Sequence, residues 1–271
     1  MCMMDLHTHS CYSDGQYSPA EVVKQAKEKG IALLAMTDHD TAAGIPEAKA
    51  AADAYGIAFF AGIELSTAGR ARQHLLGYGI DPNNKKLLQA CGEFANRRQD
   101  RAVQIAALLQ SQGVDITVDE AAAEAKGQLG KPHFARVLMR KGYTVSIAEG
   151  FARYLDTPAI RALADPKPTM QEAISLIHGA GGVAVLAHPC TLKLDADAFC
   201  SLLDAHCACG LDGLEVYYAR HTAEEIAFYA DCAARRGLLQ TGGSDYHGEA
   251  VKPDVTLGVT VPKAVFDKLA F

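Results

Sequence analysis

The 271-residue chain has no tryptophan, and aromatic residues make up only 7% of it. No apolar run approaches the roughly 20 residues that a membrane-spanning helix needs. The opening MCMMDLHTHS lacks a basic stretch followed by an apolar core, so we expect no secretory signal. With 49% hydrophobic and 21% charged residues, the composition predicts a soluble, cytoplasmic globular protein.

Paired cysteines and an excess of positive charge are also missing. The eight cysteines are scattered without a CxxC pair, which favours reduced thiols over disulfides or a zinc knot. The net charge of −6 argues against bulk binding of nucleic acid through a basic face. A small anionic substrate is still compatible, because bound metal ions can reverse the local charge. No GxSxG motif is present, so nothing indicates a covalent serine mechanism.

Strand and helix signals alternate through residues 1–80 and again through residues 169–271. Apolar runs such as IALLAMTD and GVAVLAHP are typical of strands buried on both faces. The segment SPAEVVKQAKEKG has the capping box and early proline that begin a helix, and a glycine that ends it. This alternation predicts a parallel sheet or an α/β barrel.

Residues 81–168 differ, because their apolar residues recur only at helical spacing. The segment DPKP at 165–168 then interrupts the pattern. We therefore predict one α/β domain, built from residues 1–80 and 169–271, that is interrupted by a small all-helical insert at 81–168.

Histidines and carboxylates follow the predicted strands. His7 and His9 end the first strand, and Asp38 with His39 ends the second. The same holds for later strands, with Glu64, His74, His188, Asp245 and His247 on or beside their ends. Active sites of α/β sheets lie at the carboxyl ends of the strands, so these groups are expected to converge.

The residue types and their spacing indicate metal binding. Residues i and i+2 of an extended chain point the same way, so His7 with His9, and Asp245 with His247, can hold one cation together. Imidazole nitrogen with carboxylate oxygen suits zinc, manganese or iron better than calcium. Nine ligands exceed the capacity of one four-coordinate ion, so two or three metals are expected. The nine are His7, His9, Asp14, His39, Glu64, His74, His188, Asp245 and His247.

Any one of these residues alone would be read as structural, and Asp14 alone as a turn former. Their recurrence at successive strand ends is what favours the metal site. His178 and His206 lie in helical stretches away from strand ends and are expected to be structural or surface residues.

The motifs DLHTHS…SDG, TDHD, the Glu64 strand end, AHP and GSDYH resemble those of the PHP (polymerase and histidinol phosphatase) superfamily. The resemblance implies a distorted (β/α)7 barrel that hydrolyses phosphate esters. It also implies two or three divalent metal ions, manganese first, with zinc or iron as alternatives. The expected nucleophile is a hydroxide that bridges the metals.

The resemblance further implies three metal positions and two supporting carboxylates. Asp5 and Asp38 are expected to orient imidazoles, and Asp38 is a candidate catalytic residue. His221 is a second candidate, which could protonate the leaving oxygen, bind phosphate or cap the helix at TAEE. The positions are His7, His9, Glu64 and Asp245; Asp14, His39 and His247; and Glu64 with His74 and His188.

The insert carries a second cluster of charge. GKPHFARVLMRKG at 130–142 predicts a helix whose N-terminal turn holds Lys131, His133 and Arg136. Cations there oppose the helix dipole, so a bound anion, a phosphate, would reconcile them. A solvated basic face that continues to Arg140 and Lys141 is the alternative.

This stretch resembles one branch of the superfamily, the stand-alone phosphoesterases of nucleoside 3′,5′-bisphosphates. The expected substrate is therefore a small phosphorylated nucleotide. The expected reaction is removal of its 3′-phosphate, for example from 3′-phosphoadenosine 5′-phosphate to give AMP. Three alternatives stay open: a 5′-to-3′ exonuclease on short oligonucleotides, a histidinol-phosphate phosphatase, and a non-catalytic interaction module.

Overall fold

The computed structural model describes residues 1–69, 73–125, 127, 129–163 and 167–269. Within these ranges, eight strands form one sheet in the order β7-β6-β5-β4-β3-β2-β1-β8. The strands are β1 (Cys2–Asp5), β2 (Leu33–Met36), β3 (Ala58–Ser66), β4 (His74–Tyr78), β5 (Val183–Leu186), β6 (Gly213–Tyr218), β7 (Leu239–Gly243) and β8 (Val259–Val261).

The sheet closes on itself beyond the carboxyl ends of β1 and β7. The N–H of Leu6 donates to the carbonyl of Gly242 at 3.0 Å, and the N–H of Asp245 donates to the carbonyl of His7 at 2.8 Å. Thr8 and Tyr246 form a parallel bridge beside them. The short β8 pairs antiparallel with the beginning of β1. The predicted class, a distorted α/β barrel, is confirmed, with β8 as an eighth strand in its sheet.

One strand reverses direction inside this otherwise mainly parallel sheet. β4 is antiparallel to both β3 and β5. Because only residues 67–73 separate β3 from β4, there is no room for the helical crossover that a parallel pair requires. The N-terminal end of β4 therefore lies at the same edge as the carboxyl ends of β2, β3 and β5.

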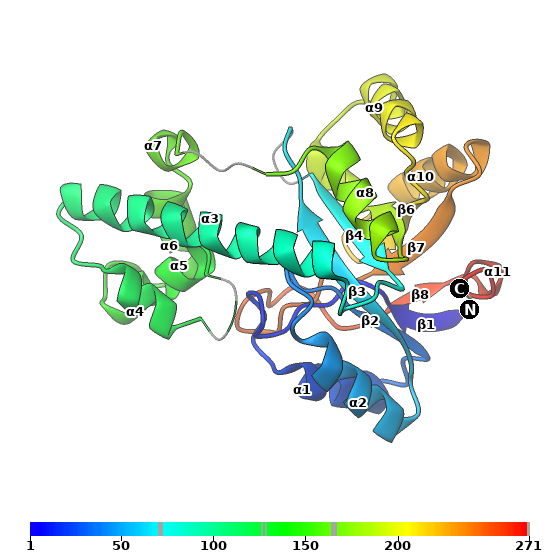
Figure 1. Cartoon of the computed structure of the whole chain (residues 1–271), viewed down its shortest axis with the longest axis horizontal. Coiled ribbons are helices and arrows are strands. Elements are labelled where there is room, and N and C mark those ends of the chain that lie inside the picture. The colour runs from blue at the N-terminus through cyan, green and yellow to red at the C-terminus, as the bar shows by residue number, and fades with distance from the viewer. Residues whose placement is uncertain (70–72, 126, 128, 164–166, 270–271) are drawn as a thin grey trace.

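Helices cover the barrel on two sides. In the view of Figure 1, α1 and α2 lie together below the sheet, whereas α8, α9 and α10 lie above it. Helix α1 begins at the predicted capping box of Ser18 and Glu21. The helices of this part are α1 (Pro19–Glu28), α2 (Ile45–Tyr55), α8 (Met170–Gly179), the 3₁₀ turn η2 (Pro189–Leu192), α9 (Ala196–Ala208), α10 (Ala223–Arg235) and α11 (Lys263–Phe266).

The regular elements described between β4 and α8 are all helices, and they extend to one side of the barrel (Figure 1). They form α3 (Lys85–Ser111), α4 (Val118–Ala123), α5 (Lys131–Arg140), α6 (Ile147–Gly150), the π-helical turn η1 (Phe151–Leu155) and α7 (Pro158–Arg161). We call residues 85–161 the helical segment.

The helical segment has an apolar core of its own, which runs from Ala102 to Ile160. The first half of α3 packs elsewhere, since Leu87, Cys91 and Phe94 belong to the core beneath α8 and β4. The predicted boundaries at residues 80 and 169 stay a prediction, and Asp165 and Pro166 of the DPKP segment lie outside the described residues. No helix in the described ranges is both long and apolar enough to cross a bilayer.

Candidate metal centre

The strand ends bring the predicted ligands to one edge of the barrel. His7 and His9 follow β1, and His39 follows β2 and pairs with Glu64 of β3 in a parallel bridge. His188 follows β5 and Asp245 follows β7, both with a positive φ, of 29° and 60°. Such backbone conformations are costly for residues other than glycine and recur at functional sites.

His74 reaches this edge by a different route. It is the first residue of β4 and pairs with Ser66, the last residue of β3. Since β4 runs antiparallel to β3, the beginning of one strand lies beside the end of the other. His74 therefore lies at the edge formed by the carboxyl ends of the other strands, although it stands at the beginning of its own strand.

Glu64 occupies the centre of the group and is fully buried. Its Oε2 atom lies 3.1 Å from His7 Nε2 and 3.2 Å from His9 Nε2. The same oxygen lies 3.1 Å from His39 Nδ1. Its Oε1 atom lies 2.9 Å from His74 Nδ1 and 3.0 Å from His188 Nε2. One carboxylate thus faces five imidazoles and can bridge two ions.

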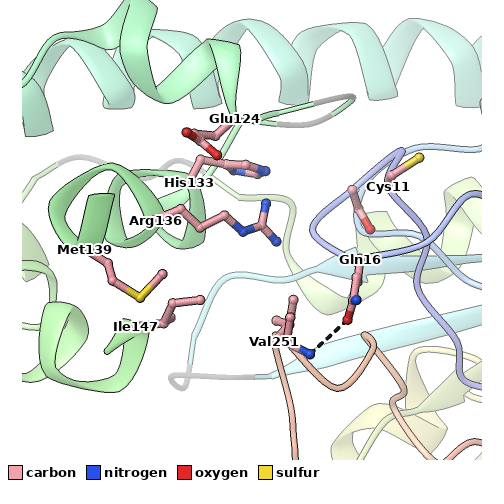
Figure 2. Close-up of a pocket in the computed structure, with 11 residues that line it drawn as sticks. Cys11, Gln16, Glu124, His133, Arg136, Met139, Ile147 and Val251 are labelled. Carbon is pink, nitrogen blue, oxygen red and sulfur yellow. Dashed lines mark hydrogen bonds between the residues drawn. The ribbon is translucent and has the colours of Figure 1, made fainter. Parts of the chain in front are cut away.

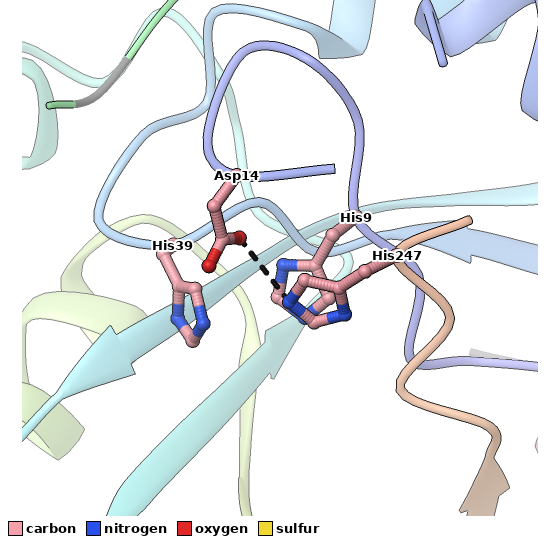
Figure 3. A group of neighbouring side chains, drawn as sticks. All are labelled: His9, Asp14, His39 and His247. Atoms are coloured by element: carbon pink, nitrogen blue, oxygen red, sulfur yellow. Dashed lines mark ion pairs between the residues drawn. The ribbon is translucent and has the colours of Figure 1, made fainter. Parts of the chain in front are cut away.

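A second group lies next to the first one and shares His9 with it. Figure 3 shows His9, His39 and His247 turned toward Asp14, whose Oδ1 atom lies 3.2 Å from His247 Nε2. All four residues offer ligand atoms within 4.8 Å of one another. Asp14 comes from the turn after β1, and His247 comes from the segment after β7.

Three sets of side chains can each hold an ion: His7, His9, Glu64 and Asp245; His9, Asp14, His39 and His247; and His39, Glu64 and His74. The first set matches the implied position residue for residue. The second adds His9 to the implied set. In the third, His39 appears with Glu64 and His74, while His188 contacts the same Glu64 oxygen, Oε1, as His74 does.

The geometry of these atoms fits divalent ions. Two ligands that each lie about 2.1 Å from a common metal are separated by roughly 3.0–3.4 Å, and most of the distances above fall in that range. Several buried atoms also have no hydrogen-bond partner among the described residues, which is costly unless something else binds them. These atoms are His7 Nε2, both ring nitrogens of His9, Asp14 Oδ1, His39 Nδ1 and Glu64 Oε2.

The buried carboxylates and imidazoles of the centre shift one another's pKa values. Burial raises the pKa of Glu64, but the imidazoles around it outweigh burial and hold that pKa well below its usual value. Burial opposes protonation of His9, but Asp245 and Glu64 raise its pKa to about 9. By contrast, burial dominates at His39 and lowers its pKa to about 3. A cationic His9 would therefore partly compensate the carboxylates, and a metal ion held by this set would take the place of its proton.

Glu215 is a supporting residue that the sequence analysis missed. Its Oε1 atom lies 3.0 Å from His7 Nδ1, and its Oε2 atom accepts the N–H of His188 at 2.6 Å. It is fully buried on β6. This contact orients His7 so that its Nε2 atom faces Glu64. The available signal was one acidic residue inside the apolar strand GLEVYY.

Asp5 and Asp38 support loops. Asp5 accepts hydrogen bonds from the hydroxyl and the N–H of Ser244, and burial raises its pKa to about 6. Asp38 accepts from the hydroxyls of Ser10 and Ser13 at 2.7 Å and 2.6 Å. Among the described contacts, neither carboxylate bonds to an imidazole nitrogen, so their expected role in orienting rings has no counterpart in the structure.

His221 lies outside the group of ligands. Its Nδ1 atom donates to the carbonyl of Val216 at 2.8 Å, and its ring packs against those of Tyr218 and Tyr229. Tyr218 in turn packs against His188. Tyr218 thus contacts both His221 and the predicted ligand His188.

Helix α5 approaches the same region from the helical segment. Arg136 donates to the carbonyl of Asp14 at 3.3 Å, and His133 accepts the N–H of Gly130 at 3.0 Å. Both line a cavity of about 330 Å³. Figure 2 shows this cavity between α5 on one side and Cys11, Gln16 and Val251 on the other. Ser13 and Gly15, the neighbours of Asp14, also line it, so the cavity adjoins the metal centre.

Lys131 has a different setting. Its Nζ atom lies 2.5 Å from Asp156 Oδ1 and above the ring of Phe151. Its charge is therefore already paired within the helical segment.

Residues 5–178 of this chain match the family model of the PHP domain. The chain belongs to the PHP family. This confirms the resemblance found in the sequence motifs.

PHP relatives match over nearly the whole chain. A 3′,5′-nucleoside bisphosphate phosphatase of Chromobacterium violaceum is 35% identical over 91% of this chain and 88% of its own length. A 5′-3′ exoribonuclease of Haemophilus influenzae is 34% identical over 90% of this chain and 89% of its own.

Two solved structures share the fold at 33% sequence identity. An amidohydrolase of Chromobacterium violaceum with bound sulfate and no metal superposes with a TM-score of 0.86, over 98% of this chain and 96% of its own. A protein of Bifidobacterium adolescentis assigned as a metal-dependent phosphoesterase has a TM-score of 0.83, over 97% of this chain and 94% of its own.

Proposed function

We propose that this PHP protein is a metal-dependent phosphoesterase that removes the 3′-phosphate from nucleoside 3′,5′-bisphosphates. The observation that carries the proposal is the placement of a cavity lined by Arg136 and His133 next to a centre of five imidazoles around Glu64. The lining also includes Glu124, whose carboxylate pairs with Arg140. The similarity to the Chromobacterium violaceum bisphosphate phosphatase supports the same substrate class. The likeness to a metal-dependent phosphoesterase supports metal dependence.

The three ligand sets would hold two or three divalent ions, with manganese proposed first and zinc or iron as alternatives. When bound, such ions neutralise phosphoryl oxygens and lower the pKa of water from about 15.7 toward about 7, which supplies a nucleophile at neutral pH. Glu64 fixes the spacing between sets, since its two oxygens face different imidazoles. Glu215 keeps His7 in the orientation that presents Nε2 to the centre.

The cavity would hold the phosphate that is not cleaved. Arg136 provides a permanent positive charge there, and phosphate binds guanidinium strongly. His133 is expected to act as a neutral hydrogen-bond donor, because burial and Arg136 lower its pKa. Its Nδ1 atom lies 3.0 Å from the N atom and 3.2 Å from the O atom of Gly130. In the tautomer whose Nδ1 accepts from Gly130, Nε2–H would donate to the phosphate. Lys131 would contribute less, since Asp156 already pairs with it.

Phosphate release from adenosine 3′,5′-bisphosphate tests the proposal. Manganese-loaded protein is expected to yield AMP, the 5′-monophosphate, as the product resolved by chromatography. His39→Ala is expected to abolish the reaction. His178→Ala is a matched control, because His178 pairs with Asp212 on the surface. Adenosine 3′-monophosphate as product would reverse the proposed orientation, and absence of any product from metal-loaded protein would reject the substrate.

A 5′-to-3′ exonuclease on short oligonucleotides is a second candidate. The similarity to the Haemophilus influenzae exoribonuclease favours it, since that relative matches almost as well. The same centre would cleave a phosphodiester while the cavity held the 5′-phosphate. A 5′-phosphorylated trinucleotide distinguishes the two: faster kcat/KM on this substrate than on the bisphosphate would make the exonuclease the principal activity.

A further inference from the structure

The two oxygens of the Asp245 carboxylate have separate environments. Oδ1 faces the metal centre, 3.3 Å from His9 Nε2 and 3.4 Å from His247 Nδ1. Oδ2 faces away from it, 2.6 Å from Lys252 Nζ and 3.2 Å from the hydroxyl of Tyr218, which donates to it. The residue is only 6% exposed, so these partners largely replace water.

The backbone of Asp245 is held in one conformation. Its φ is 60°, and its N–H donates to the carbonyl of His7 at 2.8 Å. The freedom left to the carboxylate is rotation of its oxygens, which would let both oxygens approach one ion. Lys252 and Tyr218 together oppose that rotation, because both bind the same oxygen.

Lys252 is itself held in place. It lies in a turn, and its N–H donates to the carbonyl of Gly248 at 2.9 Å. Gln16 fastens the same turn to the loop after β1, since its Oε1 accepts the N–H of Ala250 at 2.8 Å. The turn that carries Lys252 is therefore held both by its own hydrogen bond and by the loop after β1, and this places the ammonium group beside Asp245.

Charge alone does not explain a lysine at this position. A cation next to a metal ligand repels the incoming metal ion and weakens its binding. We propose that Lys252 and Tyr218 are positioning residues that hold Asp245 Oδ2, so that only Oδ1 serves as ligand in the set of His7, His9, Glu64 and Asp245. This inference rests on the proposed metal-dependent function, because it concerns how Asp245, one of the proposed metal ligands, is held.

The test compares the manganese affinity of the full-length protein with that of three variants. Lys252→Met keeps the length of the side chain and removes the charge, Tyr218→Phe removes only the hydroxyl, and Lys252→Arg retains a cationic donor. Lys263→Met is the matched control, since Lys263 pairs with Asp267 on the surface of α11. Free manganese is followed by electron paramagnetic resonance, and folding is checked by thermal unfolding.

Lys252→Met is expected to weaken the tightest manganese site about 10-fold, the effect typical of residues that hold a metal ligand. Tyr218→Phe should weaken it less, Lys252→Arg should restore most of the affinity, and Lys263→Met should change nothing. Equal or tighter binding by Lys252→Met, which simple charge repulsion predicts, would overturn the inference while the proposed function stood. Wild-type protein that takes up neither manganese nor zinc nor iron would reject both.

Discussion

The strand ends of the barrel and the helical segment present polar groups in two different ways. In the barrel, Glu64 is fully buried and each of its oxygens touches several ring nitrogens. In the helical segment, Arg136 borders a cavity, and within the described residues its hydrogen bond is a long one, to the carbonyl of Asp14. A group held by many partners can keep one geometry through a reaction, whereas a group with few partners can adjust to a ligand. We infer that the barrel sets the chemistry and the helical segment sets the substrate.

The largest effect is expected from Glu64→Gln, which keeps the shape of the side chain but removes its charge. The five imidazoles would lose their shared anion, so metal content and kcat should both fall. A loss of activity of about 10²–10³-fold is expected, as when a charge-stabilising group is removed from other active sites. Metal analysis of the purified variant gives the second readout. Retention of both metal and activity would show that Glu64 does not bridge the ions.

Much of this contrast is visible in the sequence. The strand ends were predicted from apolar runs, and residues at i and i+2, such as His7 and His9, converge for a reason that the sequence contains. The direction of β4 was not predicted, although the connection of residues 67–73 is too short for the crossover of a parallel pair. His74 is at the correct edge because of that direction.

The supporting residues were the least predictable part. Glu215 lies 208 positions from His7, so no local pattern relates them. Asp38 follows β2 beside His39, which suggested a bond to a ring, yet its oxygens turn to Ser10 and Ser13. The pairing of Lys131 with Asp156 likewise depends on how η1 packs on α5. Side-chain partners are decided by tertiary packing, which spacing along the chain does not encode.

Phe134→Ala tests whether the helical segment is a separate unit. Phe134 is fully buried in the core that runs from Ala102 to Ile160, and truncation of a buried phenylalanine costs about 3–5 kcal/mol. We expect a new unfolding transition at lower temperature, with manganese binding preserved. Phe199→Ala, in the barrel core, is the control that should weaken both. One joint transition for Phe134→Ala would mean that the two cores unfold together.

Metal affinity should depend on pH through His9. In the metal-free protein its pKa is raised to about 9, so a metal ion must displace a proton at neutral pH. Apparent manganese affinity should therefore rise about 10-fold per pH unit for each displaced proton between pH 6.5 and 8. Stability of the metal-free protein should follow the opposite sign: the contribution of His9 is complete below about 6.5 and is lost as the pH rises through about 9.

Competitive titration of manganese against a chelator at each pH measures this dependence. His178→Ala should leave the slope unchanged, because that ring is on the surface. A flat profile would show that His9 is already neutral in the metal-free protein.

Arg136→Met is expected to act on substrate choice alone. Loss of one charged hydrogen bond costs about 1.5 kcal/mol or more, so KM for a nucleoside 3′,5′-bisphosphate should rise about 10-fold. KM for an aryl phosphate, which has no second phosphate, should hardly change. Arg153→Met is the control, since Arg153 pairs with Glu149 on the surface of the helical segment. Equal effects on both substrates would place Arg136 in the reaction centre and remove the contrast between the two regions.

Lys131→Met should have the smallest effect, although Lys131 and Arg136 lie on the same helix. Asp156 already neutralises the ammonium group, and partly exposed ion pairs contribute only about 0.2–1 kcal/mol. KM for the bisphosphate should therefore change by no more than about 5-fold, and stability should fall slightly. Steady-state kinetics beside Arg136→Met measure the difference. If the two variants match, Lys131 exchanges Asp156 for phosphate when substrate binds, and the whole N-terminal turn of α5 selects the substrate.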